Sequence, residues 1–177
     1  MIYENVRERY RPLHIRFLLI AESPPPAPDI QSSRQFYYTD RIRKDDRLFI
    51  NTIRALYPET IEQKEEKIEQ DKEKWLLRFK ADGVYMIEAL TESQVHEVSK
   101  KQRRERIRDS LPQLIGKVRQ LAEPETGIIL IKSNVFDIAA GPLKEAGFKV
   151  LNTELVDYPG HFNQRVYREK LSALVSL

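Results

Sequence analysis

Four short apolar runs along the chain predict buried β-strands. They cover Ile15–Ile20, Val84–Glu88, Ile128–Lys132 and Lys149–Thr153. None of these runs alternates regularly between apolar and polar residues, as a strand with one face in water does. Continuous apolar runs are typical of parallel strands that are covered on both faces. The pattern therefore predicts a mostly parallel sheet of roughly four strands.

The segments between the apolar runs carry hydrophobic residues at helical spacing. Pro112 is expected to start a new helix, and Gly141-Pro142 is expected to break one. The spacing predicts helices over Asp46–Tyr57, Glu62–Lys80, Glu105–Leu121 and Asn134–Ala146, and a last helix with Asn163 as its cap.

Predicted strands and helices alternate along the chain, and the crossovers are long enough to hold helices. This order is typical of an α/β fold in which helices cover both faces of a parallel sheet. We therefore expect a three-layer α/β/α sandwich that forms one domain over residues 1–177. Charged helical segments at 59–80 and 92–122 lie between its strands.

The composition limits the chemistry that the chain can carry. Of its 177 residues, 41% are hydrophobic and 32% are charged, which suits a globular domain with its own core. The absence of cysteine excludes disulfides, thiol catalysis and thiolate zinc sites. With three histidines and no visible carboxylate cluster, we expect no metal and no cofactor. No GxGxxG, GxxxxGK[ST] or GxSxG motif occurs, which disfavours dinucleotide-binding, P-loop and serine hydrolase classes.

Hydrophobic segments give no sign of export or of membrane insertion. The N-terminal segment lacks the apolar core of a signal peptide, and runs such as FLLIA and GIILI are too short to cross a bilayer. The default expectation is a cytoplasmic monomer without a membrane partner.

Basic charge is concentrated in one short run. The net charge is +3 and the isoelectric point is about 9.0, which permits nucleic-acid binding without requiring it. Residues 100–108, KKQRRERIR, hold six bases and one acid. This run fits a solvated helix face and a phosphate-contacting patch equally well. In the second interpretation the DNA contacts come from Lys100, Lys101, Arg103, Arg104 and Arg106.

Polar residues follow the predicted strands at the edge where a ligand would bind. In open parallel sheets, ligand sites lie outside the carboxyl ends of the strands. Glu22 and Ser23 follow the first strand, and Glu88 ends the second. A carboxylate at Glu22 can act as a general base or orient a water, helped by a hydrogen bond from Ser23. The alternatives are that Glu22 accepts bonds from a helix N-terminus and that Glu88 forms a salt bridge with Lys132.

Aromatic residues and a histidine come close to these strand ends. His161, in the turn-rich segment DYPGHFN after the last strand, is the natural candidate for a proton donor. Phe162 is either an exposed wedge or a core residue. Prolines at 24–26 and 28 stiffen the exit of the first strand, and Phe36 and Tyr37 follow them. These rings either belong to the core or hold a flat ligand.

In their order along the chain, these motifs resemble those of the uracil-DNA glycosylase superfamily. FLLIAESPP stands where the family has a first motif of the type GEDPY or GEAPG, and GVYMIEA resembles the family's GVLLLNA strand. IILIKSNVFDIAA resembles the third strand with its helix, and YPGHFNQRVY stands where the family has an HPSPLS-type loop. The resemblance covers about residues 13–170.

The resemblance implies a protein that extrudes a base from DNA and hydrolyses its N-glycosidic bond. It also implies roles for the residues at the matching positions. Phe36 or Tyr37 would stack on the base, and Glu88 would bind its edge. Glu22 and Ser23 would position the attacking water, and His161 or Tyr158 would stabilise the departing base. Phe162 would fill the space that the base leaves in the stack, and Asn163 beside it would contact the DNA.

Three positions depart from the family pattern. Ser23 replaces an aspartate that often activates water, and Tyr158 occupies the histidine position. Glu88 replaces the asparagine that reads uracil. An ionised glutamate offers only acceptors, so it suits an exocyclic amino group better than it suits uracil. We therefore expect little uracil excision. The alternatives are a non-catalytic nucleic-acid-binding module of the same fold and an enzyme that acts on a small nucleotide-like ligand.

Overall fold

Four parallel strands form the centre of the fold. The computed structural model describes residues 2–25, 37–39, 46–92 and 99–177. Its strands lie in the order β2-β1-β3-β4, and all pairs are parallel. This confirms the predicted α/β class and the parallel four-stranded sheet. The strands are β1 (Phe17–Ala21), β2 (Val84–Glu88), β3 (Gly127–Leu130) and β4 (Lys149–Val150).

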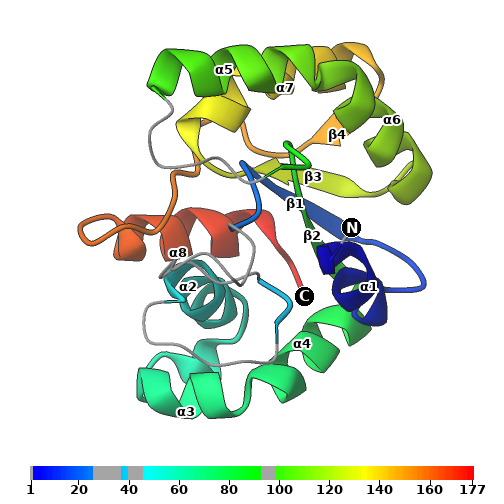
Figure 1. The fold of residues 1–177 in the computed structure, drawn as a ribbon. Coiled ribbons are helices and arrows are strands. Elements are labelled where there is room, and N and C mark those ends of the chain that lie inside the picture. The colour runs from blue at the N-terminus through cyan, green and yellow to red at the C-terminus, as the bar shows by residue number, and fades with distance from the viewer. Residues whose placement is uncertain (1, 26–36, 40–45, 93–98) are drawn as a thin grey trace.

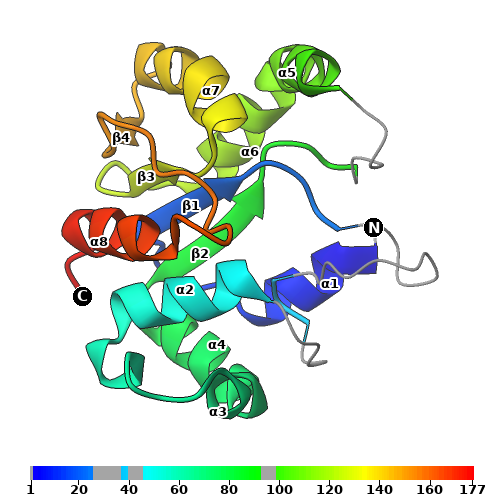
Figure 2. The same ribbon diagram turned by 90° about the vertical axis from the view of Figure 1, so that its left-hand side faces the viewer.

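Helices lie on both sides of this sheet, which is consistent with the predicted three layers. Figures 1 and 2 show α5, α6 and α7 on one side, and α1, α2, α3, α4 and α8 on the other. The described part of the chain holds α1 (Ile2–Arg9), α2 (Arg47–Leu56), α3 (Glu65–Gln70), α4 (Lys72–Ala81), α5 (Lys100–Asp109), α6 (Leu111–Leu121), α7 (Ser133–Glu145), α8 (Gln164–Leu174) and a 3-10 turn, η1 (Pro58–Thr60). None of these helices is long and apolar enough to span a bilayer.

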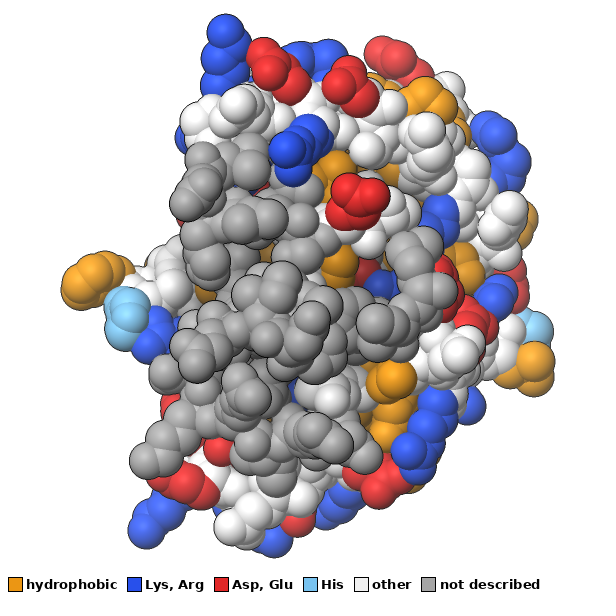
Figure 3. All heavy atoms as spheres, in the orientation of Figure 1, with side chains coloured by type: hydrophobic (Ala, Val, Ile, Leu, Met, Phe, Trp, Pro, Cys, Tyr) orange, Lys and Arg blue, Asp and Glu red, His pale blue; other side chains and the backbone are white. Residues whose placement is uncertain are grey.

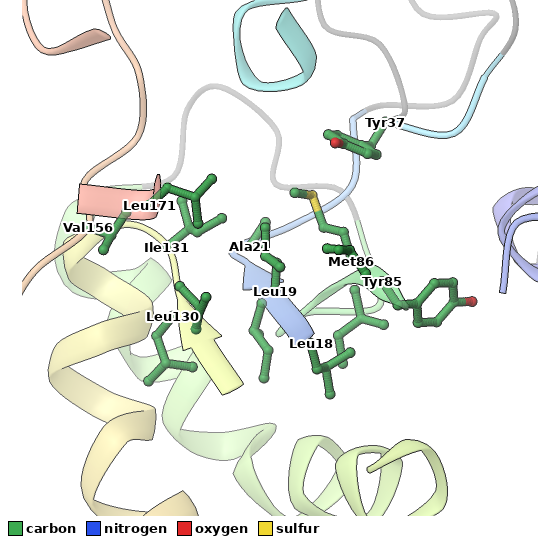
Figure 4. Close-up of a cluster of buried hydrophobic side chains, with 14 of the residues drawn as sticks. Leu18, Leu19, Ala21, Tyr37, Tyr85, Met86, Leu130, Ile131, Val156 and Leu171 are labelled. Atoms are coloured by element: carbon green, nitrogen blue, oxygen red, sulfur yellow. The ribbon is translucent and has the colours of Figure 1, made fainter. Parts of the chain in front are cut away.

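The strand register brings the polar strand ends together. Ala21, the last residue of β1, pairs with Glu88 of β2, and Ile20 pairs with Leu130 of β3. Because the strands are parallel, the residues that follow β1, β2 and β3 all emerge at one edge of the sheet. Figure 4 shows apolar side chains of the three strands packed into the core below this edge.

β4 is shorter than the predicted strand Lys149–Thr153. Beyond β4, the side chain of Asn152 replaces the backbone pairing with β3. It accepts a hydrogen bond from the Leu130 N–H at 3.0 Å and donates one to the Leu130 carbonyl at 3.1 Å. The parallel pairing resumes only as an isolated bridge between Ile131 and Val156. The last strand therefore contributes little sheet but still positions the chain that leads to α8.

Several helix predictions were wrong in their details. The predicted helix Glu62–Lys80 is divided at Asp71, whose backbone leaves the helical region at φ −91° and ψ 17°. The predicted break at Pro142 does not occur, because α7 continues through this residue and buries an apolar face on the sheet. A separate helix, α6, does begin next to Pro112, at Leu111 directly after Ser110, with Pro112 in its first turn. Asn163 precedes α8, but its side chain forms no capping hydrogen bond.

Candidate functional site

A cavity of about 550 Å³ lies at the carboxyl edge of the sheet. Segments far apart in the sequence supply its walls: the exit of β1, the end of β2, the end of β3, the start of α2 and the loop before α8. Six of the predicted site residues line this one cavity, although their chemical roles stay predictions. The lining residues are Ala21, Glu22, Ser23, Pro25, Tyr37, Asp46, Arg47, Leu48, Met86, Glu88, Ile131, Lys132, Tyr158 and His161.

Glu22 is a buried carboxylate held in place by side chains of α5, of α7 and of the residue before α7. Only 5% of its surface is exposed. Its Oε2 atom lies 2.9 Å from Lys132 Nζ and accepts a hydrogen bond from Asn134 Nδ2 at 3.0 Å. Arg103 Nη1 lies 3.8 Å from Oε1. The carboxylate therefore lies at the start of α7, where side chains rather than backbone N–H groups of the described residues bind it.

Lys132 holds a backbone conformation that non-glycine residues rarely adopt. Its φ is +81° and its ψ is 141°, and no other non-glycine residue in the described ranges has a positive φ. Its N–H donates to the Val156 carbonyl at 2.8 Å, and its carbonyl accepts from the Val135 N–H at 3.1 Å, so both neighbouring segments impose this conformation. Such strain costs about 1–3 kcal/mol and clusters at functional sites. The sequence placed Lys132 at a strand end but gave no sign of its conformation.

Glu88 is also buried, but its partner differs from the predicted one. Its carboxylate bonds Arg7 of α1, and each of the two side chains is 7% exposed. The predicted salt bridge between Glu88 and Lys132 is wrong, since Lys132 binds Glu22 instead. Burial raises the pKa of the Glu88 carboxyl above its ordinary value, although Arg7 and Lys117 oppose the shift. Glu88 thus lines the cavity as a hydrogen-bond acceptor whose position is fixed by its bond to Arg7.

Tyr37 reaches the cavity from an aromatic cluster. Its ring packs edge-on against Tyr38 and Phe49, with centroids 5.3 and 5.5 Å apart, and against Phe79 at 5.7 Å. Burial raises the pKa of the Tyr37 hydroxyl well above its ordinary value, so the hydroxyl stays protonated. Only 4% of Tyr37 is exposed, which leaves no open ring face for a base to stack on. Phe36, the other predicted stacking ring, lies outside the described residues.

The loop before α8 places two polar rings and one apolar ring at the surface. Tyr158 and His161 are exposed and line the cavity. Phe162 is fully exposed, so the interpretation as a core residue is wrong and the exposed interpretation holds. Asn163 is half-buried at the start of α8. The loop can therefore contact a large ligand on its outer side while two of its side chains face the cavity.

The basic run forms α5, and part of it is engaged inside the fold. Arg103 faces Glu22, and Arg104 Nη1 binds Asp137 of α7 at 2.7 Å. Lys100, Lys101 and Arg106 are exposed. On the face drawn in Figure 3, basic and acidic side chains of the described residues are interspersed, without a large patch of either sign. Arg103 and Arg104, two of the five residues predicted to contact phosphates, therefore pair with acidic side chains of this chain.

Neither a metal-binding group among the described residues nor a known relative identifies the site. Within the ranges that the structure describes, no group of three or more His, Asp or Glu side chains lies close enough to hold a metal ion. Comparison with known proteins gives no significant match to a family model, to a curated protein or to a solved structure.

Proposed function

We propose that this chain binds a base extruded from DNA in the cavity and hydrolyses its N-glycosidic bond. The observation that carries the proposal is the convergence of Glu22, Ser23, Glu88 and His161 on one cavity from distant parts of the sequence. Its volume of about 550 Å³ lies within the range that small-molecule sites occupy. The position outside the carboxyl ends of a parallel sheet is where such folds bind ligands.

Glu22 is suited to the chemistry at the sugar. Lys132 and Asn134 fix its carboxylate, which accepts a hydrogen bond from a water and faces the positive charge that develops on the sugar. The water oxygen bonds to the anomeric carbon as the bond from that carbon to the base nitrogen breaks. The electron pair of the broken bond leaves with the base. Glu22 takes the proton of the water, and His161 or Tyr158 donates a proton to the base.

Glu88 is suited to recognition of the base edge. Its carboxylate is an acceptor, and Arg7 behind it limits its movement. An exocyclic amino group is the complementary donor, so cytosine-like and adenine-like bases fit better than uracil.

Exposed residues around the cavity suit a DNA partner. Lys100 and Lys101 of α5 contact phosphates, and Phe162 fills the space that the extruded base leaves. Extrusion costs a few kcal/mol, about as much as unstacking one nucleotide, which binding in the cavity must offset.

Base release from defined oligonucleotides tests the proposal. Single and double strands that each contain one altered base are incubated with the protein, and abasic sites are then cleaved with alkali. We expect release of an amino-bearing base, and we expect Glu22→Gln to lower its rate by about 10²-fold or more. Glu125→Gln, at an exposed acid that binds Lys149 far from the cavity, is the matched control and keeps the rate. The proposal is rejected if excess protein releases no base from any substrate.

A small nucleotide-like ligand is the second candidate. The pairing of Arg103 and Arg104 with acids of the same chain favours it, because fewer cations are left for phosphates. This candidate predicts that a free nucleoside or nucleotide raises the melting temperature while oligonucleotides do not. Stabilisation by both kinds of ligand supports the DNA proposal instead.

A further inference from the structure

Tyr37 lines the cavity, and its buried hydroxyl has no hydrogen-bond partner in the described part of the chain. Only 4% of the residue is exposed, and its hydroxyl oxygen is bonded to no group in the part of the chain that the structure describes. A buried polar group of this kind is destabilising, and native proteins contain few of them.

Three other buried tyrosines, Tyr38, Tyr57 and Tyr167, bond their hydroxyls. The Tyr38 hydroxyl accepts from the Met86 N–H at 2.6 Å, the Tyr57 hydroxyl donates to Asp82 at 2.9 Å, and the Tyr167 hydroxyl lies 2.8 Å from Thr52 Oγ1. Tyr37 and Tyr38 are adjacent in sequence and pack against each other, yet only Tyr37 lines the cavity. Within this adjacent pair, the residue whose hydroxyl is unbonded is the one that lines the cavity.

The surrounding rings fix where this hydroxyl lies. Tyr38, Phe49 and Phe79 pack around the Tyr37 ring, so it cannot turn toward another partner without disturbing the core. Figure 4 shows the ring beside Met86, at the ends of the strands. A ligand bound against Tyr37 therefore meets a ring whose hydroxyl is held in position before binding.

We propose that Tyr37 is a specificity-determining residue whose hydroxyl donates a hydrogen bond to an acceptor atom of the bound base. The inference rests on the proposed function and extends it. Glu22 and Glu88 supply acceptors to the same cavity, while the Tyr37 hydroxyl supplies a donor. The matching ligand carries an exocyclic amino group together with a ring-nitrogen acceptor, as adenine and cytosine do. The ring of Tyr37 serves to position this hydroxyl rather than to stack on the base.

Two isosteric substitutions test the inference. Tyr37→Phe removes the unbonded hydroxyl, and Tyr38→Phe removes a bonded one that does not line the cavity. In urea unfolding of the free protein, we expect Tyr37→Phe to be at least as stable as the wild type. Tyr38→Phe is expected to be less stable, because it leaves the Met86 N–H without this acceptor.

For ligand affinity we expect the opposite ranking of the two variants. We expect calorimetric titration with adenine and with cytosine to show about three- to tenfold weaker binding to Tyr37→Phe, and unchanged binding to Tyr38→Phe. The wild type should also discriminate against deaza analogues in which one ring nitrogen is replaced by CH. Tyr37→Phe should lose that discrimination for the analogue that lacks the contacted nitrogen.

The outcomes separate the inference from the proposed function. If the wild type binds a base or releases one from DNA, and Tyr37→Phe does so equally well, the inference alone is wrong. If Tyr37→Phe is destabilised as Tyr38→Phe is, its hydroxyl has a structural partner and the inference is overturned. If the wild type neither binds a base nor releases one, the proposed function fails and the inference fails with it.

Discussion

Two residues that line the cavity, Lys132 and Tyr37, each cost the folded protein free energy. Lys132 has a positive φ, and Tyr37 carries a buried hydroxyl without a partner in the described part of the chain. Folded proteins retain such costs mainly where a site needs a group in a defined place. Both costs occur at the same cavity, which supports the proposal that ligands bind there.

The strain at Lys132 can be measured by comparing two small substitutions. Lys132→Gly and Lys132→Ala both remove the ammonium group that binds Glu22, but only glycine adopts a positive φ without a Cβ clash. We expect Lys132→Gly to be more stable than Lys132→Ala by about 1 kcal/mol in urea unfolding. Within an ordinary helix or strand glycine is the less stable of the two, so equal stability or the usual order would contradict the strained backbone.

Glu88 makes stability depend on pH. Because its pKa is higher in the folded chain than in the unfolded one, the folded state binds the proton more tightly. The contribution of Glu88 to stability is therefore present below the ordinary value of 4.5 and decreases as the pH rises through the folded pKa. Glu88→Gln cannot titrate, so its stability relative to the wild type should rise across this window.

Urea unfolding from about pH 4 to about pH 7 measures this difference. The ion pair with Arg7 forms only as the carboxyl ionises, so its loss is part of the slope, and only the difference between the neutral carboxyl and the amide shifts the whole curve. A difference that falls with pH would mean that the attraction of Arg7 outweighs burial of the carboxyl.

At the scale of elements, the start of α7 presents Asn134 and the preceding residue Lys132 to Glu22. Two glycines, one within α7 and one just after its end, allow a matched test of backbone effects. A Cβ added at Gly141 or at Gly147 would meet no atom within 4 Å, but Gly147 has a φ of +88° and Gly141 lies within the helix. We expect Gly141→Ala to raise the free energy of unfolding by about 0.5–1 kcal/mol and Gly147→Ala to lower it by about 1 kcal/mol. Chemical denaturation of both variants decides; a loss of stability in Gly141→Ala would contradict the space assigned to it.

The elements that form the sheet could be predicted because they depend on local patterns. The run Val84–Glu88 is continuous and apolar, and its predicted bounds are those of β2. The rule for parallel strands then placed Glu22 and Glu88 at one edge, and the structure puts both in one cavity wall.

Partners distant in the sequence could not be predicted in this way. Glu88 pairs with Arg7, 81 positions earlier, in a helix whose sequence IYENVRER has too few apolar residues to be recognised. The φ of Lys132 depends on its bond to the Val156 carbonyl, and the packing of Tyr37 depends on the rings of Phe49 and Phe79 from other segments. Each of these features follows from tertiary contacts, which periodicity does not report.

At the scale of the whole molecule, exposed lysines at the start of α5 provide the test of DNA binding. We expect the double substitution Lys100→Glu and Lys101→Glu to weaken binding to an oligonucleotide and to reduce its salt dependence. The control is Lys144→Glu, which reverses one exposed charge near the C-terminal end of α7, the end that lies away from the cavity. Fluorescence anisotropy at several salt concentrations measures both effects. Equal binding by the double variant and the wild type would assign these lysines no role.

The position of β1 in the sheet has a consequence for how the chain folds. β1 is an inner strand and the first of the four to be synthesised, but its neighbours β2 and β3 begin only at residues 84 and 127. Contacts across such long sequence separations slow folding, and they leave the apolar segment FLLIA unpaired while the chain is being synthesised. The cavity, whose walls extend from Ala21 to His161, is completed only when the C-terminal part has docked. We therefore expect a truncated nascent chain to bind chaperones before it can bind any ligand.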